Sequence, residues 1–357
     1  MLLASQIAGL LALSFAALFF SAPLRAQQAS FTVGTATAAA GQKVTGYLDV
    51  PAGVDAATQI PVVVVCGAKP GPVLAIVSGA HGTEYASILA VEKLIARLDP
   101  AEISGTVILV PLVNHESFQQ LVPHLNPVDK KNMNRLYPGT PDGTQTERAS
   151  WAITKQIVER CDFLIDLHGG DLDESLVPYS YWTTVGNEKV DAASREMALA
   201  FGLDYIILQS DFPRDPNAAK YLVSDALTRG KPGIIAEAGY AGVSETDDVE
   251  ALVRGNLNVM RYLKMQPGTV HPLEHPVWME KVVNLESEQE GIFYPLVRRG
   301  SYVAAGTEVG YVTDYFGKIV QEARAPVAGV VLHICALPSM AKGANIVNIG
   351  VIASKAP

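Results

Sequence analysis

Residues 73–98 read VLAIVSGAHGTEYASILAVEKLIARL, and the hydrophobic pattern of this segment changes at its glycines. Residues 73–77 form an uninterrupted apolar run, which is typical of a strand buried on both faces of a sheet. Beyond Gly79 and Gly82, apolar residues recur at helical spacing, at Ile88, Val91, Ile95 and Leu98. The segment therefore predicts a strand, a glycine turn and an amphipathic helix.

The same alternation continues along the chain. Further short apolar runs lie at residues 107–113, 163–167, 205–208 and 233–236. Helical spacing recurs at Ile153, Ile157 and Val158 and again at Leu252, Val253, Leu257 and Met260. Ahead of residue 73, short alternating runs in residues 30–71 indicate a β-hairpin. The pattern predicts an α/β fold with a mostly parallel mixed sheet flanked by helices, and functional residues at the ends of its strands.

Helical periodicity stops near residue 267. Two similar phrases follow, GSYVAAG at 300–306 and PSMAKG at 338–343, each leading into a short apolar pair. Glycine turns at matching offsets predict a small all-β domain that resembles the barrel-sandwich of lipoyl and biotinyl domains. Such carriers hold a modified lysine at a hairpin, but Ala325-Pro326 stand there in this chain. We therefore interpret the domain as structural or as one that restricts substrate access.

The composition is that of a packed globular protein, with 49% hydrophobic and 18% charged residues among 357. At this length we expect a main domain at residues 30–266 and a smaller one at residues 267–357. The net charge of −9 includes no basic run, which argues against nucleic acid as a partner. The three cysteines are isolated in apolar surroundings, so we expect buried thiols and no disulfide, at Cys66, Cys161 and Cys335.

The N-terminus carries the one membrane-directed pattern. Residues 7–20 are almost entirely apolar and are followed by small residues up to Ala26. This arrangement predicts a signal peptide at residues 1–26 and export to the periplasm. The alternative is that the segment is retained as a membrane anchor, and export is expected in both cases.

The turn after residues 73–77 places His81 three residues before Glu84. At the junction of a strand and a helix, this spacing brings an imidazole and a carboxylate to the same side of a metal ion. Taken alone, the pair is equally compatible with a surface capping interaction.

A second phrase, FLIDLHGG at 163–170, is a buried strand that ends in His168. Two histidines and Glu84 leave the fourth position of a tetrahedral zinc site open, as in catalytic rather than structural sites. Asp166 lies on the same side of the strand as His168 and is expected to fix the tautomer of that imidazole. The sequence therefore predicts a zinc site formed by His81, Glu84 and His168.

Glu237 ends the apolar run at 233–236 and is expected at the same edge of the sheet. Hydrolysis needs a base that takes a proton from water and passes it to the leaving nitrogen, and a carboxylate at this place fits that role. The alternative is a salt-bridged structural glutamate.

The polar loop at 126–139 contains Asn134 and Arg135. A guanidinium group recognises a carboxylate through two parallel hydrogen bonds, which lysine cannot match. Beside a metal site, we interpret this pair as the anchor for a substrate carboxylate.

The order HGTE (81–84), NMNRLYPG (132–139), DLHGG (166–170) and AEAG (236–239) resembles the succinylglutamate desuccinylase and aspartoacylase family, which is related in fold to zinc carboxypeptidases. The resemblance covers roughly residues 70–265. It implies that His81, Glu84 and His168 bind zinc, that Glu237 is the general base and acid, and that Asn134 and Arg135 hold a substrate carboxylate.

The sequence departs from this family at one place. Members commonly carry an arginine about ten residues before the Asn-Arg pair, where it polarises the scissile carbonyl, but this chain reads LVPHL at 121–125. His124 is the candidate substitute, and the zinc ion itself is the other.

These observations predict an exported zinc-dependent amide hydrolase, a deacylase of N-acyl amino acids or similar amides that carry a carboxylate. An exported metallocarboxypeptidase acting on peptides or cell-wall stems would use the same residues. A non-catalytic binding protein is the remaining class, and it has no need of a base such as Glu237.

Overall fold

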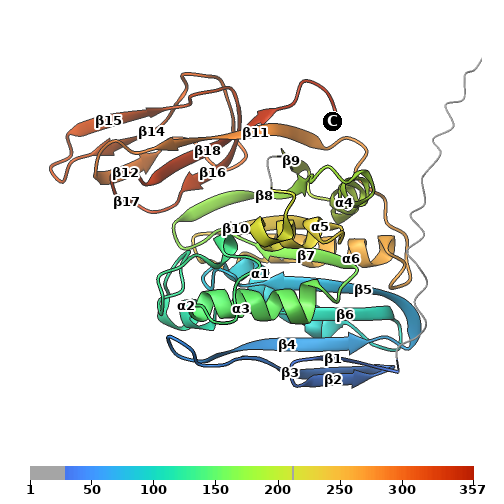
Figure 1. Cartoon of the computed structure of the whole chain (residues 1–357). Helices are drawn as coiled ribbons and strands as arrows, with labels where there is room; N and C mark the ends of the chain where they lie inside the picture. Colours follow the sequence, from blue (N-terminus) through green and yellow to red (C-terminus); the bar gives the residue numbers. More distant parts are fainter. Residues whose placement is uncertain (1–28, 211–212) are drawn as a thin grey trace, which may run out of the picture.

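The computed structural model describes residues 29–210 and 213–357, and Figure 1 shows how their helices and strands are arranged. The predicted signal peptide lies outside the described residues. The N-terminal strands are β1 (Ser30–Val33), β2 (Ala36–Ala39), β3 (Gln42–Val50) and β4 (Thr58–Cys66). The strands of the central region are β5 (Lys69–Ser78), β6 (Ser104–Val110), β7 (Phe163–His168), β8 (Glu174–Thr183), β9 (Tyr205–Gln209) and β10 (Gly233–Tyr240).

The C-terminal region contains strands and no helix within its described residues from β11 onward, as its lack of helical periodicity predicts. These strands are β11 (Val277–Glu286), β12 (Gly291–Pro295), β13 (Tyr302–Val303), β14 (Glu308–Thr313), β15 (Ile319–Arg324), β16 (Gly329–Cys335), β17 (Ser339–Met340) and β18 (Asn345–Ile352).

The helices all precede β11. They are α1 (Tyr85–Arg97), α2 (His115–Gln120), α3 (Gln145–Ile153), α4 (Glu188–Phe201), α5 (Leu222–Thr228) and α6 (Thr246–Tyr262), with short turns η1 (Met133–Arg135), η2 (Thr154–Val158) and η3 (Pro216–Ala218). The helices predicted around Ile88, Ile153 and Leu252 are α1, α3 with η2, and α6. None of the helices in the described residues is both long and apolar enough to cross a membrane.

Twelve of the described strands form one mixed sheet, in the order β13-β16-β18-β11-β9-β8-β10-β7-β5-β6-β4-β3. Its centre is parallel, because β6, β5, β7 and β10 all run in one direction. The expectation of a mostly parallel sheet holds for this centre but not for the flanks. Strands β3 and β4 pair antiparallel with their neighbours, and β8 pairs antiparallel with β10 but parallel with β9. The C-terminal strands β16 and β18 pair antiparallel with each other, and β18 pairs antiparallel with β11.

Both faces of the parallel centre are covered. Leu74 and Ile76 of β5 point toward α1, α4 and α6, which form one hydrophobic core with them. Val73 and Val77 point the other way, into a core shared with β1, β2, α3 and α5. This double coverage explains why the central strands read as uninterrupted apolar runs. It leaves the ends of these strands as the places where polar groups gather.

The C-terminal strands form a sandwich that is continuous with the large sheet. Strands β12, β14, β15 and β17 form a second sheet, and its Phe293 and Val312 pack against Ile346 and Val347 of β18. Strand β11 pairs with β9, and β16 pairs with β8. Figure 1 shows these strands, in orange and red, beyond β8 and β9. The predicted β domain is therefore attached to the central region through shared sheet hydrogen bonds.

The three cysteines lie in the described residues and are buried free thiols. Burial raises the pKa of Cys161 to about 12, which keeps its thiol protonated and unreactive.

Candidate metal centre

Three adjacent parallel strands carry the predicted metal ligands and the predicted base. His81 and Glu84 lie in the turn between β5 and α1, His168 is the last residue of β7, and Glu237 lies in β10. Glu237 and His168 are Cα partners in the β10–β7 ladder. The carboxyl ends of parallel strands meet at one edge, so residues far apart in the chain come together there.

His81, Glu84 and His168 form a compact buried cluster whose ligand atoms all lie within 4.8 Å of one another. The two Glu84 carboxylate oxygens face the two imidazoles: Oε1 lies 2.5 Å from Nδ1 of His81, and Oε2 lies 2.9 Å from Nδ1 of His168. Both histidines therefore present the same ring nitrogen to the same carboxylate. Two neutral imidazoles and a carboxylate are a donor set that suits zinc.

The glycines of the turn allow it to lie close to α2. Gly79 has a φ of 70°, a left-handed conformation that favours glycine. The Gly82 N–H donates to Ser117 Oγ at 2.9 Å, and a Cβ atom at Gly82 would lie 2.3 Å from the backbone nitrogen of Phe118. Substitution of Gly82 would therefore push the ligand turn away from α2.

The outer nitrogen of each imidazole has its own partner. Nε2 of His81 lies 3.1 Å from Oδ1 of Asn132, and Nε2 of His168 lies 3.3 Å from Oδ1 of Asp166. A metal at Nδ1 leaves Nε2 protonated, and both of these oxygens are acceptors. Within the described residues, neither Asp166 oxygen has a well-aligned hydrogen bond, although both are buried. Asp166 is therefore placed to accept from Nε2–H of His168 when a metal occupies Nδ1, and Asn134 Nδ2, which lies 3.2 Å from the same nitrogen, would then have to turn to another acceptor.

The electrostatics of the ligand cluster favour the ionised form of Glu84. Burial opposes ionisation of this carboxyl, but the charges and hydrogen bonds of His81 and His168 outweigh it and hold its pKa well below the usual range. Conversely, burial disfavours the charged form of His168, yet Asp166 and Glu84 raise its pKa well above the ordinary value. Positive charge is therefore stabilised at this place, which is what a bound cation requires.

Glu237 lies in a different environment from Glu84. Its Oε2 accepts a hydrogen bond of 2.7 Å from the Tyr179 hydroxyl of the neighbouring strand β8. Burial raises the pKa of Glu237 to about 7, although the positive charge of His168 and the Tyr179 hydroxyl act in the opposite direction. Two carboxylates whose environments push their pKa values apart are typical of an acid–base site, where one is a fixed anion and the other exchanges protons.

His124 lies beside the cluster, with its ring centroid 6.0 Å from that of His81. Its Nε2 is 3.1 Å from Asp173 Oδ1, and its backbone N–H donates to Asp171 Oδ2 at 3.0 Å. Burial disfavours the charged ring, but the Asp173 hydrogen bond and the surrounding carboxylates raise the pKa of His124 to about 9. The residue also has a left-handed backbone, with a φ of 60°, a strain that recurs at functional sites.

Asn134 and Arg135 occupy different places although they are adjacent. The Asn134 side chain is buried, with Nδ2 3.2 Å from Nε2 of His168 and Oδ1 accepting from the Leu222 backbone at 3.3 Å. Arg135 is exposed, and its guanidinium lies over the ring of Tyr221, 4.8 Å from the centroid. No carboxylate among residues 29–210 and 213–357 pairs with Arg135. Arg135 Nη1 donates to the Asn134 carbonyl at 2.6 Å, which leaves its other guanidinium nitrogens available to a ligand. Asn134 is engaged with the metal cluster, and the roles of both residues toward substrate stay predictions.

A model of the succinylglutamate desuccinylase/aspartoacylase catalytic domain matches residues 70–263, more than half of the chain. The chain belongs to this family. The family consists of zinc-dependent amide-bond hydrolases, and the predicted recognition is therefore confirmed. A curated relative, the N-alpha-acetyl-L-2,4-diaminobutyric acid deacetylase of Halomonas elongata, is 29% identical over 278 residues, which are 75% of this chain and 79% of the relative.

Solved structures of similar proteins have the same fold. A succinylglutamate desuccinylase from Silicibacter sp. TM1040 superimposes with a TM-score of 0.79 at 22% identity, covering 93% of this chain and 98% of that one. The product-bound ectoine utilization protein EutE (DoeB) of Ruegeria pomeroyi has a TM-score of 0.77 at 25% identity, covering 87% and 95%. The high coverage of both chains shows that the C-terminal sandwich is part of the shared fold.

Sequence reasoning did not assign a role to several residues at this family site. Asn132 precedes Asn134 in the same motif, and the DLDE run at 171–174 directly follows the phrase that contains His168. Their closeness in sequence to predicted site residues could have identified both. Tyr179 lies in an aromatic stretch with Tyr181 and Trp182, and this stretch alone assigns it no partner. Nothing in the local pattern pointed to the Tyr179–Glu237 bond, because it joins residues 58 positions apart.

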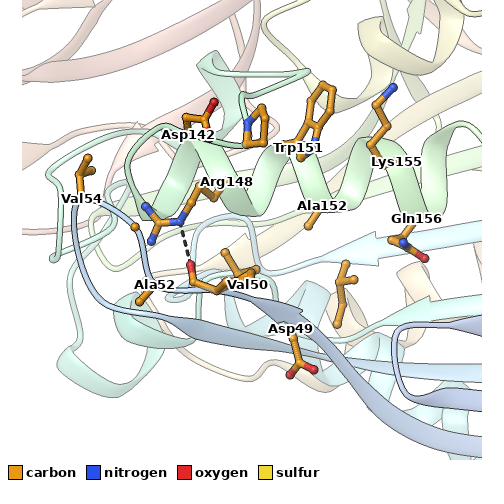
Figure 2. Close-up of a pocket in the computed structure, with 14 residues that line it drawn as sticks. Asp49, Val50, Ala52, Val54, Asp142, Arg148, Trp151, Ala152, Lys155 and Gln156 are labelled. Carbon is orange, nitrogen blue, oxygen red and sulfur yellow. Dashed lines mark hydrogen bonds between the residues drawn. The ribbon is translucent and has the colours of Figure 1, made fainter.

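A separate hollow of about 490 Å³ lies between the β3–β4 loop and α3, and its lining contains none of the predicted site residues. Figure 2 shows Arg148 directed toward that loop, with Trp151 and Lys155 farther along the helix. The Arg148 guanidinium is already satisfied by the carbonyl oxygens of Pro51 and Gly143 and by Asp55. This hollow is therefore explained as the junction that attaches the loop to α3.

Proposed function

We propose that this family member is an exported zinc-dependent deacylase that cleaves N-acyl amino acids, and that the substrate carries a free carboxylate. The observation that carries the proposal is the grouping of His81, Glu84 and His168 with Glu237 at the ends of three adjacent parallel strands. The ligands and the base come from separate elements, so Glu237 can exchange protons without being a ligand. A protein that only binds a ligand has no use for a buried carboxyl with a pKa near 7.

Each side chain then has a distinct task. When bound there, zinc supplies a Lewis acid that polarises a carbonyl and lowers the pKa of water. Glu237 accepts the proton of the attacking water and delivers it to the leaving nitrogen, because its raised pKa suits both transfers at neutral pH. Tyr179 holds the Glu237 carboxylate by one oxygen and leaves the other free to exchange the proton.

His124 takes the place of the carbonyl-polarising arginine in this proposal. A charged imidazole 6.0 Å from His81, between ring centroids, stabilises negative charge that develops on the substrate oxygen. Asp171 and Asp173 keep this imidazole charged and fix its direction. Because Nδ1 and Nε2 both face carboxylates, His124 acts on the oxyanion through its charge rather than by donating a hydrogen bond.

The proposal includes the substrate class. An N-acetyl amino acid is the first compound to assay, and N-acetyl-diaminobutyrate belongs in the panel because the Halomonas relative is named for it. Wild-type turnover should be compared among N-acetyl amino acids, N-succinyl amino acids, their carboxamides and short peptides. Turnover of peptides alone would favour the carboxypeptidase reading, and equal turnover of an acid and its carboxamide would refute recognition of a carboxylate.

Arg135→Lys gives the matched test of the anchor. We expect KM for the free acid to rise about tenfold with little change in kcat, because lysine keeps the charge but loses the planar fork. Arg135 is exposed, so the expected effect is at the lower end of the ~1.5–3 kcal/mol of a charge-assisted contact. Lys130→Met, which removes an exposed cation from the same loop, is the control and should leave KM unchanged.

Export rests on the apolar residues 7–20 and the small residues that follow them. Protein recovered from the periplasm should begin after Ala26. Recovery of full-length protein in the membrane fraction would instead show that the segment is retained, and recovery in the cytoplasm would contradict export.

A further inference from the structure

Arg299 links the C-terminal sandwich to the strand that carries Glu237. It lies in the turn between β12 and β13, and its Nη1 donates to two backbone carbonyls of the large sheet. These are the oxygens of Leu176 in β8, at 2.7 Å, and of Gly239 in β10, at 3.0 Å. One guanidinium nitrogen therefore bridges two neighbouring strands of the central region.

Leu176 and Gly239 are paired residues at one end of an irregularity in the β8–β10 ladder. Glu237 pairs with Tyr179 and Gly239 pairs with Leu176, so β8 has two residues, Val177 and Pro178, where β10 has one. A proline cannot donate a ladder hydrogen bond, and a bulge is where a sheet accommodates it. Buried carbonyls next to such a bulge need donors from outside the ladder. Arg299 is that donor.

The same guanidinium also holds the start of helix α6. Nη1 lies 2.9 Å from Asp248 Oδ2, and Nη2 lies 2.7 Å from Glu245 Oε2. Its central carbon lies over the ring of Tyr240, 5.6 Å from the centroid. These carboxylates offset the charge of Arg299 while the carbonyls use its directional donors. A lysine ammonium could satisfy the charge but not this set of directions.

The bulge begins at the catalytic position itself. Glu237 is two residues from Gly239, and Tyr179, which holds the Glu237 carboxylate, is three residues from Leu176. A shift between β8 and β10 would therefore change the direction of Glu237 relative to the ligands on β5 and β7. A misplacement of about 1 Å in a catalytic group costs on the order of 10²-fold in rate.

We infer that Arg299 is a positioning residue for Glu237, through which the C-terminal sandwich fixes the β8–β10 bulge at the site. The inference rests on the proposed role of Glu237 as the base. Arg299 touches no ligand of the candidate metal site, and it acts through the two strands that it bridges.

The test is a double-mutant cycle in the full chain, with an N-acetyl amino acid that the wild type cleaves. Arg299→Met should lower kcat about ten- to hundredfold while metal content stays at the wild-type level and KM changes by less than about threefold. In a Glu237→Gln background, where no base remains to be positioned, the same change should alter the residual kcat by less than about twofold. Arg298→Met, at the adjacent exposed residue, should leave kcat unchanged.

Arg299→Lys keeps the charge near Asp248 and Glu245 and serves if Arg299→Met does not fold. It should show a reduced kcat with an unchanged KM, and wild-type kcat in this variant would overturn the inference. An equal loss from Arg299→Met in both backgrounds would also overturn it and leave Arg299 a structural residue. Wild-type kcat in Glu237→Gln alone would refute the proposed base instead, so the two failures are distinguishable.

Discussion

The metal-bearing edge of the large sheet and the C-terminal sandwich differ in what their buried side chains do. At the edge, buried His81, Glu84 and His168 lie in contact with one another. In the sandwich, the buried side chains are mainly apolar, such as Phe293 and Val312. Buried ionic groups are costly to desolvate and add little net stability, whereas apolar burial is the main stabilising term. The polar cluster at the edge therefore adds little to stability, and the apolar cores on the two faces of the sheet hold it in place.

The largest expected effect contrasts one residue from each region. His168→Ala should abolish metal binding and activity, because two ligands do not make a zinc site. Phe293→Ala, in the sandwich core, should cost about 3–5 kcal/mol of unfolding free energy and leave bound metal near one ion per chain when the protein is folded. Elemental analysis and denaturant unfolding measure the two quantities. Full metal content in His168→Ala would contradict the assigned site.

A smaller but still large effect is expected for the base. Glu237→Gln keeps the shape of the side chain and removes its capacity to exchange a proton, so kcat should fall by a factor on the order of 10² to 10⁴. Metal content should remain at the wild-type level, because Glu237 is not in the ligand cluster. Wild-type kcat in this variant, or loss of the metal, would show that Glu237 has another role.

The site and the sandwich also differ in how much of their structure the sequence predicts. The metal cluster was predictable because its residues stand at the ends of apolar runs, and parallel strands of a doubly covered sheet end at one edge. Strand β8 was not predicted, because Pro178 interrupts it and its burial pattern does not alternate simply. The structure shows that this proline is accommodated by the bulge beside Glu237.

Two other features depend on contacts between distant parts of the chain. The sequence predicts a small domain for the residues of β11 and β18, and in the structure both strands also belong to the large sheet. The spacing of their apolar residues does not reveal this pairing. Arg299 reaches Gly239 across 60 positions of sequence, from a turn whose local pattern indicates only a solvated arginine. Local periodicity predicts whether a segment forms a helix or a strand. Which distant segments contact one another is decided by packing and by hydrogen-bonding groups that need partners.

The smallest expected effect concerns the hydroxyl that holds Glu237, and it is a shift in the pH profile. The Tyr179 hydroxyl bonds to the Glu237 carboxylate at 2.7 Å, which favours the ionised form and lowers its pKa. Glu237 must be ionised to accept a proton, so activity should rise with pH through its pKa.

Tyr179→Phe removes the stabilising donor, raises the pKa of Glu237 and should move the acid limb of kcat/KM to higher pH. A hydrogen bond to a charged group is worth about 1.5–3 kcal/mol, and one pKa unit is about 1.4 kcal/mol, so a shift of about one to two units is expected. Tyr311 in the C-terminal sandwich gives a matched control: its ring stacks on that of Tyr294 with centroids 5.0 Å apart, and Tyr311→Phe should leave the limb in place because the bond to Glu237 comes from Tyr179. An acid limb that stays fixed in Tyr179→Phe, or moves to lower pH, would show that Glu237 is not the group whose ionisation sets the profile.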